Sequence, residues 1–126
     1  MQLSKLFTIV ICSYISLFLC SCANPESNFS FAGDWISSGS DSAGNEYTFA
    51  AKVIDKGDGK FRMLVLDKLG TKKKPMHVMD GELVNNKFPH TADNGIYTGS
   101  GELTKDQFTG WYKGPVDGTY KMQRVK

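Results

Sequence analysis

The side chains best suited to acid–base chemistry in this chain are His77, His90 and Glu82. A catalytic histidine needs a partner close enough to set its protonation state. These two histidines are the only ones in the sequence, they stand 13 positions apart, and no carboxylate pattern accompanies them. The sequence also contains no G-x-S-x-G, Walker A or H-E-x-x-H motif. The chain is therefore expected not to be an enzyme.

Metal binding is not expected either. The cysteines and histidines do not have the spacing of a zinc site. The segment Asp55-Lys56-Gly57-Asp58-Gly59 resembles part of a calcium loop, but positions 63 and 65 are Met and Val, so the closing Glu is missing. This segment is interpreted as a hairpin turn, and the sequence predicts no metal and no cofactor.

The cysteines at the end of the N-terminal apolar run suggest a different chemistry. After Lys5, the chain from Leu6 to Leu19 carries no charge. A run of about 15 residues is short for a bilayer-crossing helix, which needs roughly 20. It fits the apolar region of a cleaved signal peptide. Cys20 and Cys22 follow this run directly.

The segment Leu19-Cys20-Ser21-Cys22 resembles the bacterial lipobox. In that motif a Leu stands three places before the acylated cysteine and a small residue stands just before it, as Leu19, Ser21 and Cys22 do. Cys20 fits less well, because Leu19 would then directly precede it. A plain cleaved signal and an uncleaved hydrophobic anchor are the alternatives.

The lipobox resemblance implies three parts of the chain. Residues 1–21 are a lipoprotein signal peptide, residues 22–30 are the lipidated Cys22 with a flexible polar tether, and residues 31–126 are one β-barrel domain. Several acyl chains on one cysteine would give a stable membrane anchor, since each buried methylene contributes about 0.8 kcal/mol. The implied location is the bacterial cell envelope, at the outer membrane in a host with two membranes.

The charge of the exported part argues against a nucleic-acid partner. All 13 acidic residues and 14 of the 15 basic ones follow Cys22, which leaves a net charge of about +1 (14 − 13). Nucleic-acid binders usually carry a strongly basic face. The run Lys72-Lys73-Lys74 is interpreted as a solvated loop, with a contact to anionic lipid head groups as the alternative. No cysteine follows residue 22, so the domain has no disulfide.

The pattern after residue 30 is typical of an all-β domain. Tyr47, Phe49, Ala51 and Val53 occupy every second position, as on one face of a strand. Glycine-containing turns separate similar short segments, and Asn85-Asn86 is suited to a tight hairpin. We expect about eight short antiparallel strands in an up-and-down meander that closes, or nearly closes, into a small barrel. The predicted strands are 31–38, 46–55, 60–67, 75–84, 87–89, 96–103, 108–113 and 119–125.

The segment Gly33-Asp34-Trp35 resembles the G-x-W signature of the calycin group, which includes lipocalins, fatty-acid-binding proteins and small bacterial protease inhibitors. In those families the Trp closes one end of the barrel and a basic residue of the last strand covers its ring. The resemblance assigns barrel closure to Gly33, Trp35 and Arg124. A guanidinium over an indole contributes about 0.5–2 kcal/mol.

A second resemblance spans residues 51–62 and 78–83. These segments, AKVIDKGDGKFR and VMDGEL, look like a small β module of bacterial secreted proteins that sometimes precedes domains of the 3-keto-disaccharide hydrolase type. No such domain follows in this sequence, so the resemblance implies an accessory role.

The first function hypothesis is a non-catalytic binding module for a small apolar ligand or a glycan. The candidate ligand-binding residues are aromatic or methionine side chains on the predicted strands, namely Tyr47, Phe49, Met63, Tyr97 and Trp111. The interior of an eight-stranded barrel is just wide enough for side chains or one small ligand. Strands this short favour an interior filled by side chains.

The second hypothesis is a protein-interaction module, an inhibitor or an accessory partner of an envelope enzyme. It would use the N-terminal tether and the loops 39–45, 68–74 and 91–95 rather than a cavity.

Overall fold

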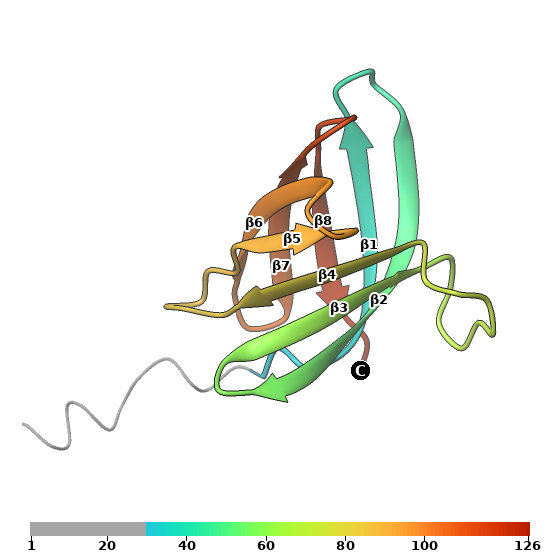
Figure 1. Ribbon diagram of the computed structural model, residues 1–126. Coiled ribbons are helices and arrows are strands. Elements are labelled where there is room, and N and C mark those ends of the chain that lie inside the picture. The colour runs from blue at the N-terminus through green and yellow to red at the C-terminus, as the bar shows by residue number, and fades with distance from the viewer. Residues whose placement is uncertain (1–29) are drawn as a thin grey trace, which may run out of the picture.

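Eight strands follow one another around a closed antiparallel barrel in chain order (Figure 1). The computed structural model describes residues 30–126, so the predicted signal peptide, Cys22 and almost all of the tether lie outside the described residues. The strands are β1 (Gly33–Asp41), β2 (Glu46–Gly57), β3 (Lys60–Leu66), β4 (His77–Glu82), β5 (His90–Ala92), β6 (Tyr97–Leu103), β7 (Gln107–Lys113) and β8 (Gly118–Arg124). The predicted all-β meander is confirmed.

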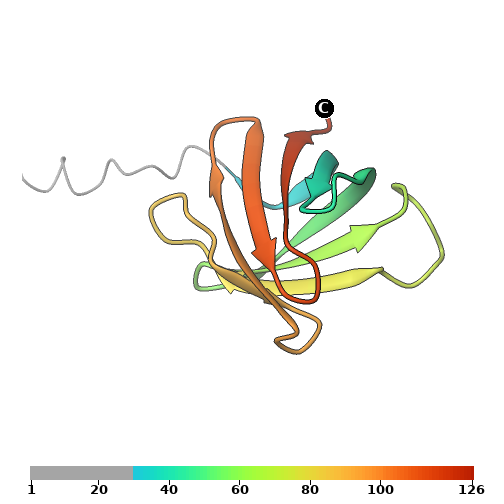
Figure 2. The ribbon, with the colours of Figure 1, turned by 90° about the horizontal axis from the view of Figure 1, so that it is seen from above.

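The barrel closes where the first strand pairs with the last. The β1–β8 ladder runs from Trp35, opposite Arg124, to Asp41, opposite Gly118. Viewed from above, the strands form a ring in which these two elements are neighbours (Figure 2). Closure leaves no strand edge among the described residues, which removes the usual template for aggregation.

The fifth strand lies three residues later than predicted. Pro89 has no backbone N–H, so the chain enters a regular ladder only after it, at His90–Ala92. The predicted segment 87–89 is still tied to its neighbours, because the Phe88 amide donates to the Gly101 carbonyl at 2.8 Å. Thr91 and Ala92, expected in a loop, therefore belong to β5.

The β2–β3 and β4–β5 turns contain residues with positive φ, a conformation that Gly, Asn and Asp adopt more readily than other residues. Asp58 and Gly59 have φ values of 57° and 77°, and Asn85 and Asn86 have 52° and 62°. Two successive residues with positive φ are what a tight two-residue hairpin needs. Asp93 and Asn94, between β5 and β6, are also left-handed, with φ of 53° and 58°.

One end of the barrel is packed with aromatic rings around Phe31. The Phe31 ring contacts those of Trp35, Phe61, Phe88 and Phe108, with centroids 5.0–6.0 Å apart. Phe31, Trp35, Phe88 and Phe108 are almost completely buried. The described chain enters the barrel here, and the C-terminus lies at the same lower end in Figure 1.

Inward-facing glycines let aromatic side chains lie flat against the wall. Gly110 is opposite Tyr120, and a Cβ at Gly110 would lie 2.5 Å from Tyr120 Cζ. A Cβ at Gly101 would lie 2.2 Å from Phe108 Cζ. Glycines at such sites permit the strong coiling that a small barrel requires, and a neighbouring aromatic ring covers each gap.

Among the described residues, each strand is paired on both sides. The buried cluster found there runs from Phe31 to Met122. The strand pairings that close the barrel lie within residues 30–126. Within this part of the chain, no helix has the length and apolar character needed to cross a membrane.

Candidate ligand-binding site

A cavity of about 390 Å³ occupies the end of the barrel opposite the Phe31 cluster. In an up-and-down meander the turns alternate between the two ends, and the cavity lies at the end that carries the β1–β2, β3–β4, β5–β6 and β7–β8 turns. Its wall is mainly aromatic and aliphatic: Asp41, Tyr47, Thr48, Phe49, Val65, Met76, His77, Met79, His90, Ala92, Tyr97, Tyr112, Val116 and Tyr120.

Small residues occupy several inward positions in this half of the barrel, although the rings of Tyr47 and Tyr120 cover the gaps at Gly39 and Gly110. Gly39, Ala92, Gly99 and Gly110 present no large side chain to the interior. The expectation that side chains fill the interior therefore holds only at the Phe31 end. Sequence alternation identifies the inward face, but only the three-dimensional register shows that these small residues gather in one half.

Two buried polar residues, His90 and Tyr120, are among those that line the cavity, and each has one polar atom without a hydrogen-bond partner. His90 is 5% exposed and Tyr120 is 3% exposed. Nδ1 of His90 lies 3.0 Å from the Phe88 carbonyl oxygen, whereas His90 Nε2 and the Tyr120 hydroxyl have no partner in the structure. A buried polar atom without a partner costs about 1–3 kcal/mol.

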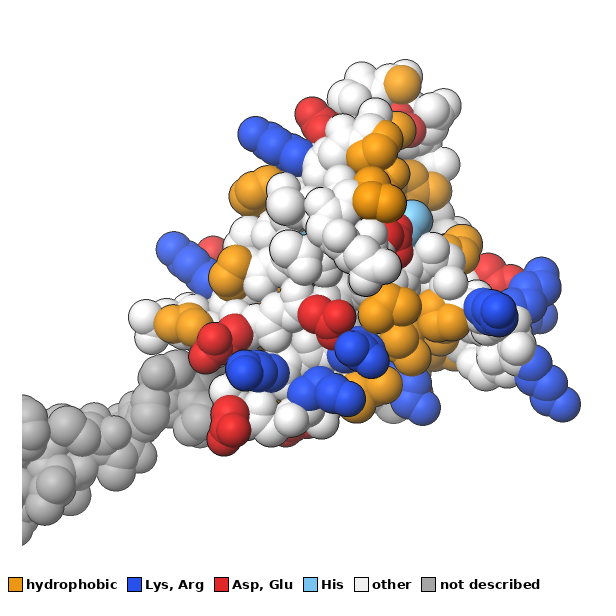
Figure 3. Space-filling view, in the orientation of Figure 1, with side chains coloured by type: hydrophobic (Ala, Val, Ile, Leu, Met, Phe, Trp, Pro, Cys, Tyr) orange, Lys and Arg blue, Asp and Glu red, His pale blue; other side chains and the backbone are white. Residues whose placement is uncertain are grey.

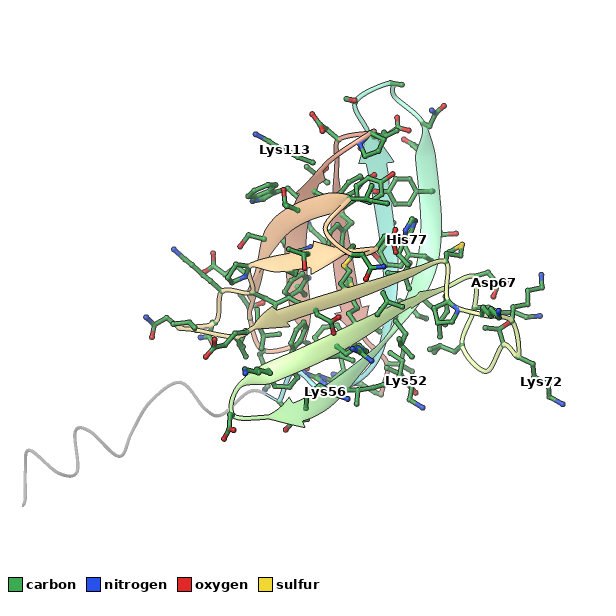
Figure 4. All side chains as sticks on the ribbon, in the orientation of Figure 1. Lys52, Lys56, Asp67, Lys72, His77 and Lys113 are labelled. Atoms are coloured by element: carbon green, nitrogen blue, oxygen red, sulfur yellow. The ribbon has the colours of Figure 1, made fainter. Side chains whose placement is uncertain are left out.

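Polar pairs surround the mouth of the cavity. The hydroxyl oxygens of Tyr47 and Tyr112 lie 2.8 Å apart, and His77 Nδ1 lies 2.6 Å from Asp93 Oδ2. Figure 4 shows His77 at the start of β4, and Figure 3 shows hydrophobic side chains gathered over the upper half of the same face. The opening thus has an apolar surface interrupted by satisfied polar contacts.

The inner part of the cavity favours neutral groups. Burial lowers the pKa of His90, and the hydrogen bond at the Phe88 carbonyl only partly offsets this effect. Burial also raises the pKa of Tyr120 and, together with the hydrogen bond to Tyr112, that of Tyr47. At neutral pH the His90 imidazole and both phenols therefore carry no charge.

Three of the five predicted ligand-binding residues line the cavity, namely Tyr47, Phe49 and Tyr97. Met63 faces inward but is fully buried in the packed core and does not reach the cavity. Trp111 lies on the outer surface, 44% exposed, with Lys113 Nζ 5.7 Å from its ring centroid. On β7 the inward positions are Phe108, Gly110 and Tyr112, so the expected inward position of Trp111 is not observed.

The three residues assigned to barrel closure lie together at the packed end. The Arg124 guanidinium carbon is 4.4 Å from the centroid of the Trp35 ring. Arg124 Nη1 donates to the Ala32 carbonyl at 3.1 Å, and Nη2 donates to the Ser30 carbonyl. Gly33 has a φ of 133°, and a Cβ there would lie 3.3 Å from Arg124 Nη1. Gly33 thus lets the chain turn closely beneath the guanidinium.

The three candidates for acid–base chemistry are not brought together. His77 and Glu82 are at opposite ends of β4, and His90 is hydrogen-bonded to the backbone on β5. Among residues 30–126, no group of three His, Cys, Asp or Glu side chains could hold a metal ion.

Sequence reasoning did not select His90 or Tyr112 as ligand contacts. The strict alternation on β7 places Tyr112 on the same face as Phe108, and this pattern could have identified it. His90 offered no such signal, because β5 has only three residues.

The comparisons with known proteins concern the fold. No family model matches the chain, and no curated protein matches it. A redesigned β-barrel, mFAP1, bound to DFHBI, superposes with a TM-score of 0.61 at 10% identity over 74% of this chain and 94% of its own. Another redesigned β-barrel, b11L5F_LGL, gives 0.56 at 13% identity over 75% and 91%. The chain has the fold of a small eight-stranded antiparallel β-barrel.

Proposed function

We propose that this protein is a non-catalytic binding module that holds one small apolar molecule in the open half of its barrel. The observation that carries the proposal is the cavity of about 390 Å³ with its aromatic wall. This volume lies at the lower end of the range for small-molecule sites, about 300–1,000 Å³. The similar barrel mFAP1 holds DFHBI, which is in keeping with a ligand in such a barrel.

An apolar molecule suits the cavity better than a glycan. A sugar carries many hydroxyl groups, and each would lose its water on entering a wall made mainly of rings and aliphatic side chains. The Tyr47 and Tyr112 hydroxyls are already bonded to each other. A compound with a large apolar surface and few polar groups would gain the most from burial here.

The proposal includes the lipid anchor at Cys22. Its support is the lipobox-like sequence. Ser30, whose carbonyl accepts a hydrogen bond from Arg124, lies at the packed end of the barrel. With the anchor attached at that end, the open mouth would face away from the membrane, toward ligand in the aqueous compartment. The loop with Lys72 projects to one side of the barrel (Figure 4).

Binding can be tested with N-phenyl-1-naphthylamine, a neutral dye whose fluorescence rises in apolar sites. Titration of the residue 30–126 fragment should give a saturable increase. Ala92→Phe places a ring in the cavity and should abolish it, whereas Thr91→Phe, on the outward face of the same strand, should not. Absence of a signal, or equal binding by both variants, would contradict a cavity site.

A protein-interaction role is the second candidate, favoured by one outer surface. Ile36, Ala50 and Leu66 are aligned across β1, β2 and β3. Ile36 is 58% exposed, Leu66 is partly exposed, and Ala50 between them is buried. Such a row could pack against an envelope protein, including an enzyme for which this chain is an accessory. Ile36→Lys should then prevent recovery of that partner from solubilised envelopes without changing dye binding.

A further inference from the structure

We propose that the outer face of the barrel around Trp111 binds a pyranose ring of a neutral glycan, at a site separate from the cavity. The observation that carries the proposal is an exposed indole beside a groove whose walls carry polar groups. Trp111 is 44% exposed, and a groove of about 340 Å³ lies against it. Among residues 30–126, no other aromatic side chain belongs to the exposed surface. The site neither requires nor excludes the apolar ligand proposed above.

The strand register surrounds the indole with polar side chains. Trp111 pairs with Ser100 on β6 and with Thr119 on β8. Directly opposed side chains on one face of an antiparallel pair have Cβ atoms about 4.5–5.5 Å apart. Along β7, the alternation places Thr109 and Lys113 on the same outer face. The ring therefore stands alone as an apolar surface, with hydroxyl groups on either side of it and an ammonium group beside it.

Two turns form the walls of the groove next to the ring. They are the β1–β2 turn, which contributes Asp41 and Ser42, and the β7–β8 turn, which contributes Asp117. The Ser42 amide donates to the Asp117 carbonyl at 2.9 Å, so the two turns are held together. The Gly114 amide donates to Asp117 Oδ1 at 3.2 Å and fixes the carboxylate. Groups held in place before a ligand arrives reduce the entropic cost of binding.

The groove offers both acceptors and donors to the edge of a ligand. The hydrogen bond from Gly114 uses only one carboxylate oxygen of Asp117, so Oδ2 can accept from a ligand hydroxyl. The Lys113 ammonium can donate, and it forms no ion pair with the described part of the chain. Figure 4 shows Lys113 extending away from the barrel. Hydrogen bonds that involve a charged group are stronger than neutral ones.

A pyranose ring matches one flat apolar surface with polar surroundings. One face of the sugar carries C–H bonds, whose hydrogens are attracted to the electron-rich face of an indole, and its hydroxyls project from the edge. A protein partner would be expected to bury Trp111 among other apolar side chains, which its neighbours on β6 and β8 do not supply. A nucleotide could stack its base, but its phosphates would meet Asp41 and Asp117 with Lys113 as the one cation in the groove. The same carboxylates favour a neutral sugar over an acidic one.

Chitohexaose and cellohexaose are suitable probes, because both are neutral chains of β-linked pyranose rings and only the first carries amide groups. Titration of the isotopically labelled residue 30–126 fragment, followed by NMR, should give saturable shifts with at least one of them. The indole N–H signal of Trp111 and the amide signals of the groove should move. The indole signal of Trp35, which is buried at the packed end, should stay in place and serves as an internal control.

Variants separate this site from the cavity. Trp111→Ala should weaken oligosaccharide binding by about tenfold or more, because the ring supplies the stacking surface, and Trp111→Phe should restore part of it. Ala92→Phe fills the cavity and should remove binding of N-phenyl-1-naphthylamine without changing that of the oligosaccharide. Val84→Ala removes an exposed apolar side chain between β4 and β5 and should change neither. The NMR spectrum shows whether each variant is folded.

The outcomes distinguish the two proposals. Absence of shifts with both oligosaccharides, or equal binding by wild type and Trp111→Ala, overturns the outer site and leaves the cavity proposal in place. Loss of oligosaccharide binding in Ala92→Phe would place the sugar in the cavity and would also overturn the outer site. A fragment that binds an oligosaccharide through Trp111 but does not bind the dye supports the outer site and contradicts only the cavity proposal.

Discussion

Arg124 covers the indole of Trp35 from the adjacent strand, and the two residues are direct partners across the β1–β8 closure. The indole N–H donates to the Phe31 carbonyl at 3.1 Å. The guanidinium donates hydrogen bonds to the carbonyls of Ala32 and Ser30. One cation thus links the last strand, the first strand and the segment that closes the packed end.

Replacing Trp35 should strongly destabilise the barrel. Trp35 is completely buried, so Trp35→Ala should lower the free energy of unfolding by about 3–5 kcal/mol. Arg124→Ala should cost less, because its side chain is partly exposed, and Lys121→Ala on the outer face of β8 serves as a control. Urea denaturation of both single variants and the double variant measures their coupling. Purely additive effects would show that the ring and the guanidinium do not stabilise each other.

Adding a single methyl group inside the wall should also be costly. Gly110→Ala would place a Cβ 2.5 Å from Tyr120 Cζ, and overpacking of this kind costs about 1–3 kcal/mol. Thr109→Ala, at the exposed neighbouring position on β7, should change stability by less than about 0.5 kcal/mol. Thermal unfolding of the two variants compares them. Equal stability would mean that Tyr120 does not need the space above Gly110.

The strand pattern and the order of the strands could be predicted from sequence, because alternation and glycine-containing turns are local signals. Tyr47, Phe49, Ala51 and Val53 showed the inward face of β2, and seven of the eight predicted strands overlap the observed ones. The fifth strand was misplaced because a proline can stand at either end of a strand. Pro89 was expected to end the strand 87–89, whereas in the structure it directly precedes β5.

The cavity was harder to predict, because it depends on which inward positions become neighbours. Gly99 on β6 and Gly110 on β7 are ordinary glycines in sequence, and only the β5–β6 and β7–β8 registers show that they lie beside His90 and Tyr120. Trp111 was misassigned because aromatic character alone does not indicate a face. Its neighbours Gly110 and Tyr112 take the inward positions instead.

Two tyrosines in the cavity wall should respond in opposite directions to loss of a hydroxyl. The Tyr120 hydroxyl is buried without a partner, so Tyr120→Phe should leave stability unchanged or raise it by about 1 kcal/mol. The Tyr47 hydroxyl is 2.8 Å from that of Tyr112, so Tyr47→Phe should lower stability by about 0.5–1.5 kcal/mol. Chemical denaturation of the ligand-free fragment gives both values. A loss of stability in Tyr120→Phe would reveal an unseen partner for that oxygen.

The proposed anchor is testable in cells. Cys22→Ala should move the protein from the membrane fraction to the aqueous fraction, because the acyl chains can no longer be attached. Cys20→Ala should leave it in the membrane. Mass spectrometry of the mature protein should find acyl mass on the N-terminal cysteine, and a mature form without that mass would contradict the lipobox interpretation.

Acidification should destabilise the barrel through His90. Burial holds the pKa of this imidazole below the ordinary value of 6.5. As the pH falls through 6.5, the unfolded chain takes up a proton that the folded chain still excludes. Linkage then makes stability decrease with decreasing pH until the folded pKa is reached. Above pH 6.5 this contribution is constant.

The variant His90→Gln isolates this effect, since its amide N–H can still donate to the Phe88 carbonyl and does not titrate. Between pH 7.5 and pH 5, the wild-type fragment should lose more stability in urea denaturation than the variant. The His77–Asp93 pair is present in both proteins, so its contribution cancels in the difference. Identical pH profiles would show that His90 is protonated as readily in the folded barrel as in the unfolded chain.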